Sequence, residues 1–202
     1  MERNHFDQAR KLSSYDYLCK ALFRLAASKR IRSISVKELC ADAHLNRSTF
    51  YASFSSMDDF LNTVMRDVAG GLVQVVTDYG KNENLLLRKG AAYECYRDWF
   101  KYVDDNRDAF EALTGHNGLP EFRTLLDSQG IEWYGKLLRP LLPKFESRIS
   151  LEALAIYIVS AHQGLMMWYL GNGQRYSADY MARQLNLLTF EGSFSLLNLF
   201  CE

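Results

Sequence analysis

Residues 35–60 read SVKELCADAHLNRSTFYASFSSMDDF, and this stretch decides the fold. Ser35 precedes a short apolar pattern and Glu38 follows three residues later, so the pair predicts a capping box at the start of a helix over 36–43. Asn46 is a second capping residue and predicts another short helix directly after it. Two capped helices separated by about three residues indicate a helix-turn-helix, a motif whose second helix enters the major groove of DNA.

The turn between the two helices contains His44. Such a turn needs a residue in the left-handed conformation, which His, Asn and Asp adopt more readily than most other non-glycine residues. We therefore expect a backbone role for His44 rather than metal binding or acid–base chemistry. The apolar positions of both helices form a small shared core, which comprises Val36, Leu39, Cys40, Ala43, Leu45, Phe50 and Phe54.

The second helix, over about 46–53, carries polar side chains on its outward face. Such side chains can donate hydrogen bonds to phosphate oxygens and base edges. They are Arg47, Ser48, Thr49, Tyr51 and Ser53. The sequence therefore predicts a DNA-contacting surface on this helix.

Helical spacing dominates the rest of the chain, and strand patterns are weak, so the fold class is all-α. Ser56 caps a helix with acidic residues in its first turn, where the helix dipole favours them. We expect a DNA-binding domain over 1–56 and a larger ligand-binding and dimerisation domain over 57–202, with the helix over 57–79 as connector. Helices are expected at about residues 7–29, 36–43, 46–53, 57–79, 85–103, 107–113, 120–138, 151–170 and 178–199.

Charge is unevenly distributed along the 202 residues, although the formal net charge is zero. Residues 1–55 hold ten Lys and Arg against five Asp and Glu, so the remainder is acidic. A basic segment on an acidic body suits a protein that reads a polyanion selectively. A chance fluctuation of surface charge explains the same numbers, so charge alone does not decide between the two.

Composition points to a cytoplasmic protein. The four cysteines, Cys19, Cys40, Cys95 and Cys201, form no C-x-x-C pair and are expected to be free thiols in a reducing compartment. The polar N-terminus has no signal-peptide core, and no uninterrupted apolar run reaches the ~18 residues that suggest a membrane span. We expect no membrane partner.

The stretch quoted above resembles the TetR family of bacterial transcriptional regulators, whose pattern is approximately T-V-R-D-I-A-x-x-A-G-V-S-x-x-T-L-Y-x-H-F-x-S-K-E-E-L. The positions that match in kind, without a gap, are Ser35, Val36, Leu39, Ala43, Leu45, Asn46, Thr49, Phe50, Tyr51, Phe54, Ser56, Asp58, Asp59 and Phe60. The resemblance implies a three-helix DNA-binding domain, a connecting helix, and an all-α domain for ligand binding and dimerisation. With Lys37 included, the candidate DNA-binding residues are Ser35, Lys37, Arg47, Ser48, Thr49, Tyr51 and Ser53.

Three positions depart from the family pattern. His44 replaces the turn glycine, Ser53 replaces a frequent histidine, and Met57 replaces a frequent lysine. The last change removes a cation that in the family often meets phosphate, which would weaken the grip on DNA or alter the operator. The helix-turn-helix pattern itself is intact.

The second half resembles one TetR subgroup more loosely. The stretches DDNRDAFEALTGHNGLPEFRTLL (104–126) and GLMMWYLGNGQRYSADYMARQL (164–185) are similar to that subgroup's E-N-R-x-F-F-x-x-L-L and W-W-L-x-N-G patterns. The subgroup includes regulators that resemble the activator of dihydroxyacetone kinase genes. The motifs do not identify the ligand.

Two C-terminal helices are apolar over so much of their circumference that each must bury more than one face. By family resemblance they form a four-helix bundle across a two-fold axis, and paired recognition helices ~34 Å apart then read a palindrome. A monomer core is the alternative. The candidate dimer residues are Leu151, Leu154, Ile158, Leu165, Trp168, Tyr169, Leu185 and Leu188.

Aromatic residues concentrate in the middle of the second half, where most serve as core and several can line a cavity for a small-molecule effector. The candidate cavity residues are Tyr96, Trp99, Phe100, Phe110, Phe122, Trp133, Tyr134, His162 and Met166. An effector that prefers one separation of the DNA-binding domains would shift the population and change DNA affinity, with the connector as lever. Gly70 and Gly71 mark either a bend in that helix or close packing.

Two rival function classes stay open. An enzyme is disfavoured because no nucleophile elbow, P-loop or dinucleotide fingerprint occurs, and none of His5, His44, His116 and His162 lies at metal-ligand spacing from another. A helical protein-interaction module that has lost DNA binding is kept open by Ser53, Met57 and the zero net charge. We expect no catalytic residue, metal or cofactor, and a repressor, the commoner outcome in the family.

Overall fold

The computed structural model describes residues 13–80, 89–140, 149–172 and 175–193. Every regular element in these ranges is helical, which confirms the all-α class. The elements, in chain order, are α1 (Ser14–Ala26), the short 3₁₀ helix η1 (Ile31–Ser33), α2 (Val36–Asp42), α3 (Arg47–Tyr51), α4 (Met57–Gly80), α5 (Lys89–Asp105), α6 (Arg107–Thr114), α7 (Pro120–Leu138), α8 (Leu151–Gly171), α9 (Ala178–Leu187) and the π-helix η5 (Leu188–Ser193).

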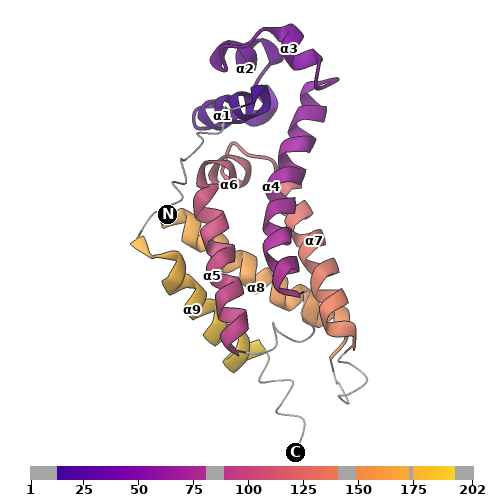
Figure 1. The fold of residues 1–202 in the computed structure, drawn as a ribbon, viewed down its shortest axis with the longest axis vertical. Helices are drawn as coiled ribbons and strands as arrows, with labels where there is room; N and C mark the ends of the chain where they lie inside the picture. The colour runs from indigo at the N-terminus through magenta and orange to yellow at the C-terminus, as the bar shows by residue number, and fades with distance from the viewer. Residues whose placement is uncertain (1–12, 81–88, 141–148, 173–174, 194–202) are drawn as a thin grey trace, which may run out of the picture.

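The helices form two groups joined by α4. Figure 1 shows α1, α2 and α3 together at one end, with α4 running from them into a body made of α5 to α9. In that body α5 packs on α9 and α7 packs on α8, while α4 contacts both α5 and α7. One cluster of buried apolar side chains continues from α1 through α4 to α9. The two groups therefore share a continuous core rather than lying on opposite sides of a hydrated gap.

Capping residues set several helix starts. The Ser13 side chain accepts a hydrogen bond from the amide of Asp16, and the Asp16 carboxylate accepts one from the amide of Ser13, so α1 begins at Ser14. Residues 7–12 of the predicted first helix lie outside the described residues. The amide of Asp59 donates to Ser56 Oγ at 3.1 Å, which is the predicted cap of α4.

Two helices, α5 and α9, end at other residues than the sequence predicts. α5 begins at Lys89 and extends two residues beyond the predicted Val103, to Asp105; residues 85–88 lie outside the described residues. The last helix is shorter than predicted: α9 ends at Leu187 and the chain continues as a π-helix. Residues 194–199 of that prediction also lie outside the described residues.

The Gly70–Gly71 pair in α4 lies beside Tyr102 of α5. A Cβ atom on Gly71 would lie 2.1 Å from Tyr102 Oη, whereas one on Gly70 would meet no atom within 4 Å. The Tyr102 hydroxyl donates to the carbonyl of Val68 at 3.1 Å. Gly71 thus makes room for the Tyr102 side chain. Close packing, rather than a bend, explains a glycine at this position, because the helix is uninterrupted.

The helix α8 is 21 residues long and mostly apolar. By length and composition alone it could cross a membrane, but 44% of its apolar window is buried inside the protein. Its buried positions pack mainly against α7, and Leu154 and Ile158 form a small cluster with Leu138. These contacts are those of a core helix.

Two sets of contacts tie the N-terminal helices to the rest of the molecule. The carbonyl of Asn117, in the loop between α6 and α7, accepts a hydrogen bond from the amide of Ile31 at 2.9 Å. The Asn117 side-chain amide donates to the carbonyl of Ala26 at 3.0 Å. The Tyr15 hydroxyl of α1 donates to Asp67 of α4 at 2.7 Å. The loop between α6 and α7 therefore holds both the end of α1 and the start of η1 in place through Asn117.

Candidate nucleic-acid interface and effector cavity

The segment 35–54 folds as two short helices joined by a tight turn. His44 lies in that turn with a φ of 54°, the left-handed conformation expected from the sequence. The amide of Leu45 donates to the carbonyl of Cys40 at 2.9 Å and closes the turn. Leu39 and Phe50 are fully buried, so the inward sides of α2 and α3 pack on a common core. This arrangement leaves the opposite side of α3 at the surface.

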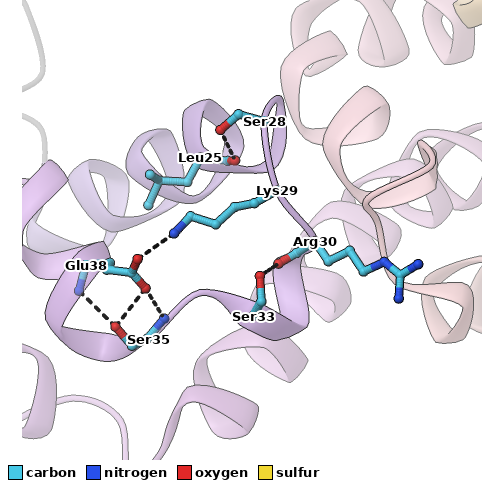
Figure 2. Close-up of polar contacts among 7 residues, drawn as sticks. All are labelled: Leu25, Ser28, Lys29, Arg30, Ser33, Ser35 and Glu38. Carbon is cyan, nitrogen blue, oxygen red and sulfur yellow. Dashed lines mark hydrogen bonds and ion pairs between the residues drawn. The ribbon is translucent and has the colours of Figure 1, made fainter.

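The start of α2 is held by three polar residues, shown in Figure 2. The amide of Ser35 donates to Glu38 Oε2 at 2.9 Å, and the amide of Glu38 donates to Ser35 Oγ at 3.2 Å. The Lys29 ammonium also binds Glu38, and these hydrogen bonds, that of Lys29 above all, lower the pKa of Glu38 to about 2. The Ser35 hydroxyl donates to Glu38 at 2.8 Å, so its hydrogen is already used within the protein. Ser35 therefore serves first as a cap.

The outward face of α3 carries most of the predicted DNA-binding residues. Tyr51 is 56% exposed, Arg47 and Ser48 are also exposed, and Thr49 is half-buried. The helix ends at Tyr51 rather than at the predicted Ser53, so the exposed Ser53 follows α3 instead of belonging to it. The Tyr51 ring meets the buried ring of Phe50 edge-on, at 5.4 Å between centroids, which limits how far it can move. Asn46 occupies the cap position of α3, but its side chain makes no capping hydrogen bond. The exposed side of α3 is thus a compact set of hydrogen-bond donors around one aromatic ring.

The cations of the N-terminal helices divide into paired and unpaired ones. Arg24 binds Asp42 at 2.6 Å, and Lys29 binds Glu38. Lys37 and Arg47 have no ion-pair partner within the described residues, and both are exposed. Since paired cations are largely neutralised, the positive charge left at the helix-turn-helix comes from these two side chains, which is where a phosphate would be met.

A cavity of about 70 Å³ lies in the body between α4, α5, α7, α8 and α9. Its walls are mostly apolar and aromatic, as is usual for sites that bind small molecules. The lining residues are Leu72, Val73, Val76, Tyr96, Trp99, Leu126, Gly130, Trp133, Tyr134, Val159, His162, Gln163, Met166 and Leu185.

Six of the nine candidate cavity residues line this space. They are Tyr96, Trp99, Trp133, Tyr134, His162 and Met166. The other three, Phe100, Phe110 and Phe122, are fully buried elsewhere in the core. Phe100 packs edge-on against Tyr169 at 5.3 Å, and Phe110 lies 6.0 Å from Phe122. These three rings fill space rather than border it.

The structure adds an α4 wall that the sequence analysis did not include. Leu72, Val73 and Val76 form it, and their spacing along one helical face was the only signal available. Thr189 is another addition, behind the lining residues, where its hydroxyl lies 3.3 Å from both Tyr96 Oη and His162 Nε2. Both additions come from elements distant in the chain from the aromatic cluster.

Polar groups of the cavity are concentrated on the α8 side. Tyr134 Oη lies 3.1 Å from His162 Nδ1, so both nitrogens of that ring have a neighbour. Part of His162 borders the cavity, and enclosure by the surrounding helices lowers its pKa to about 3. Burial also raises the pKa of Tyr96 to about 12. At neutral pH these groups therefore carry no charge.

Four of the eight candidate dimer residues are used inside the protomer. Leu154, Ile158, Tyr169 and Leu185 are buried. Trp168 and Leu188 are exposed, and Leu151 and Leu165 are half-buried. The exposed face of α8 begins with the charged Glu152 and continues with Ala153, Ile156, Tyr157, Ser160, Ala161, Gly164 and Trp168. We call this largely small and apolar surface the outer α8 face; among the described residues, Trp168 at its end contacts Tyr176, and its positions from Ala153 to Gly164 remain exposed.

Neither a protein-family model nor a curated protein sequence matches the chain. Solved structures do match it over nearly its full length. The dihydroxyacetone kinase operon activator DhaS superposes with a TM-score of 0.60 at 16% identity, covering 94% of this chain and 99% of the other. PfmR, a TetR-family transcriptional regulator from Thermus thermophilus, has a TM-score of 0.66 at 18% identity, covering 90% and 98%.

A putative TetR-family transcriptional regulator from Syntrophomonas wolfei is similar at a TM-score of 0.68 and 14% identity, covering 91% of this chain and 95% of the other. These proteins are described as an operon activator and as transcriptional regulators, not as enzymes. The chain has the fold of TetR-family transcriptional regulators. The matching structures include the dihydroxyacetone kinase operon activator, which belongs to the subgroup that the second half of the sequence resembles.

Proposed function

We propose that this protein is a cytoplasmic, homodimeric transcriptional regulator that binds a palindromic DNA operator through α3 and is released from it by a small-molecule effector. The observation that carries the proposal is the exposed face of α3, where Tyr51 lies among hydrogen-bond donors, together with the exposed cations Lys37 of α2 and Arg47 of α3, which have no ion-pair partner within the described residues. Phosphate contacts position such a helix and base contacts give it specificity.

The proposed division of labour follows the two groups of helices. Residues 1–56 would bind DNA, and residues 57–202 would bind the effector and a second copy of the chain, with α4 as connector. The outer α8 face supports dimerisation, because an exposed apolar helix face in water favours association. Two α3 helices set ~34 Å apart by a two-fold axis would read a palindrome.

Release by an effector requires that the ligand prefer one arrangement of the helices over another. The cavity is bordered by α4, which carries α3 at its far end, and by α7. A ligand that spreads α4 from α7 would therefore shift the two α3 helices of a dimer relative to one another. Repression, with the effector weakening DNA binding, is the direction we propose.

A protein-interaction module is the second candidate. Two observations favour it: the Ser35 hydroxyl is committed to Glu38, and Met57 lies where a phosphate-binding lysine would be expected from the family pattern. Such a module would show no salt-dependent affinity for duplex DNA, so DNA binding separates the two candidates.

The test is selection of bound sites from random duplexes, followed by affinity measurements across a range of salt concentrations. We expect a palindromic site and affinity that falls steeply as salt rises. Arg47→Ala should lower the slope of log K against log salt by about 1. Arg123→Ala removes an exposed arginine of α7 and should leave the slope unchanged.

Tyr51→Ala should abolish preference for the selected site while leaving the helical content and the oligomer mass unchanged. Its side chain is mostly exposed, so little core is lost with it. Equal affinity of the Tyr51→Ala and parent proteins for the site would show that α3 does not read the DNA.

A further inference from the structure

We propose that the cavity takes a compact, uncharged ligand made of an aromatic ring and one amide- or carbonyl-type group, which pairs with Gln163, and that it rejects the corresponding anion. The inference deepens the proposed function, since it names the class of effector for the same cavity.

The absence of charge is the first step. No Asp, Glu, Lys or Arg occurs among the described residues that line the cavity. Its one ionisable base, His162, is neutral at physiological pH, because enclosure lowers its pKa to about 3. A carboxylate or ammonium group brought into such a site loses its hydration and gains no opposite charge, which is strongly unfavourable. The occupant must therefore be neutral where it is enclosed.

Aromatic side chains form much of the cavity wall. Trp99 of α5 and Trp133 of α7 both line the cavity, together with the ring of Tyr134. Aromatic walls favour a flat ring as ligand, because offset and edge-on ring contacts are attractive beyond the area that they bury. The volume of about 70 Å³ is about half of the ~150 Å³ of a cavity that holds benzene, so a single ring enters only if the walls move apart, which is the spread of α4 from α7 proposed above.

Gln163 supplies a polar group on the cavity wall. Its side chain lines the cavity, is only 7% exposed, and has no hydrogen-bond partner among the described residues. Its polar atoms are not among the fully enclosed ones of the described residues and remain open to the cavity, so the two donors and one acceptor of the amide are well matched by an amide or carbonyl group of a ligand. The nearby ring of His162 is not available in the same way, since Tyr134 and Thr189 lie within hydrogen-bond distance of its two nitrogens. The structure thus assigns Gln163 as the polar anchor.

The experiment compares three ligands of nearly equal shape on the full-length protein: benzamide, benzoate and toluene. Binding is measured at pH 7 by calorimetry, with the fluorescence of Trp99 and Trp133 as a reporter of position. We expect saturable binding of benzamide and toluene, and binding of benzoate weaker than that of benzamide by about tenfold or more.

The variant Gln163→Leu removes the anchor while keeping the side chain close to the same size. We expect it to weaken benzamide about three- to tenfold and to leave toluene unchanged or tighter. Gln74→Leu is the matched control, because Gln74 is an exposed residue of α4 that does not line the cavity. It should change none of the three affinities.

Three results would overturn the inference: benzoate binding as tightly as benzamide, benzamide affinity unchanged by Gln163→Leu, or no saturable binding of either neutral compound. The comparison of ligands on the parent protein needs no variant, so it stands even if Gln163→Leu does not fold. All of these measurements are made without DNA. Ligand binding without duplex binding would refute the regulatory function alone, and duplex binding without neutral-ligand binding would refute the ligand class alone.

Discussion

At the scale of single residues, His44 shows how a departure from a family pattern can be accommodated. It is the one non-glycine residue with positive φ among the described residues, and the left-handed conformation costs a non-glycine residue about 1–2 kcal/mol. His, Asn and Asp tolerate this conformation better than β-branched residues do. The turn therefore forms without glycine, but its tolerance of substitution is narrow.

We predict that His44→Val destabilises the protein by about 1–2 kcal/mol, because valine is strongly disfavoured at a φ of 54°. His44→Asn, which keeps a residue suited to this conformation, should stay within about 0.5 kcal/mol of the parent. The free energy of unfolding in urea provides the measurement. Equal stability of the Val and Asn variants would mean that the turn is not constrained by its backbone.

The partly buried His162, enclosed by the surrounding helices, makes stability depend on pH. Its pKa is about 3 in the folded chain and 6.5 when exposed, so below pH 6.5 the unfolded chain binds a proton that the folded chain does not. This contribution to stability is complete above pH 6.5 and is lost as the pH falls towards 3. We predict that the parent loses up to about 1.4 kcal/mol per pH unit more than His162→Gln across this window. Parallel unfolding curves for the two proteins from about pH 7 to 5 would contradict the assignment.

At the scale of elements, α8 is apolar on two sides for two different reasons. One side, with Leu154 and Ile158, packs inside the protomer, largely against α7. The outer α8 face remains exposed. The Trp168 ring at its end lies tilted against that of Tyr176 at 5.1 Å, and Tyr176 stacks at 5.1 Å on Tyr180 of α9. This aromatic row extends the outer face from α8 onto α9 and gives a broad surface for a second copy.

We predict that Tyr157→Glu, in the middle of the outer α8 face, converts the proposed dimer to monomers, because burying an unpaired carboxylate opposes association. Tyr157 is 55% exposed and Tyr17 of α1 is 45% exposed, so Tyr17→Glu is a matched control that should leave the oligomer intact. Sedimentation or light scattering reports the mass. A dimer that survives Tyr157→Glu would place the interface elsewhere.

At the scale of the whole molecule, the contact between the N-terminal helices and the body is what would couple the proposed effector to the proposed DNA binding. Besides the shared apolar core and the bonds of Ile31 and Tyr15 described above, two side-chain links join the N-terminal helices to the body. Asn117 donates a partly buried hydrogen bond to the carbonyl of Ala26, and Arg32 forms ion pairs with Asp58 and Glu121. The Arg32 side chain is 52% exposed, and exposed ion pairs contribute little, so the Asn117 link is expected to dominate.

We predict that Asn117→Ala lowers the free energy of unfolding by about 1 kcal/mol, and that Arg32→Ala lowers it by less than about half of that. Asn172→Ala provides a control, because the Asn172 side chain makes a similar bond to the carbonyl of Trp168 on the exposed end of α8. A larger loss for Arg32→Ala than for Asn117→Ala would reverse the ranking of the two links.

Much of this fold was predictable because its signals are local. The capping box of Ser35 and Glu38 and the cap at Ser56 each involve residues three apart, so the sequence shows them directly. Where prediction failed, the cause was a change of helix type, as at the end of α9, where the chain continues in a π-helix that no capping residue announces.

The candidate sites were predictable only in part. Apolar periodicity cannot say which of several buried aromatics border an empty space, so Phe100, Phe110 and Phe122 were grouped with true lining residues such as Trp99. The same limit applies to α8, where Leu154 and the exposed Tyr157 are both compatible with an interface on periodicity alone.

The starts of the helices from 36 to 57 and from 107 to 178, the helix-turn-helix of α2 and α3, and the outward position of Arg47 and Tyr51 follow from the order of residues, because caps and helical periodicity act within a few residues. Which face of α8 packs inside the protomer, and the meeting of Tyr96 and Thr189 beside one cavity, follow only from the way the distant helices pack. Both depend on which apolar faces of distant helices pack against one another, and a pattern within a few residues carries no information about that.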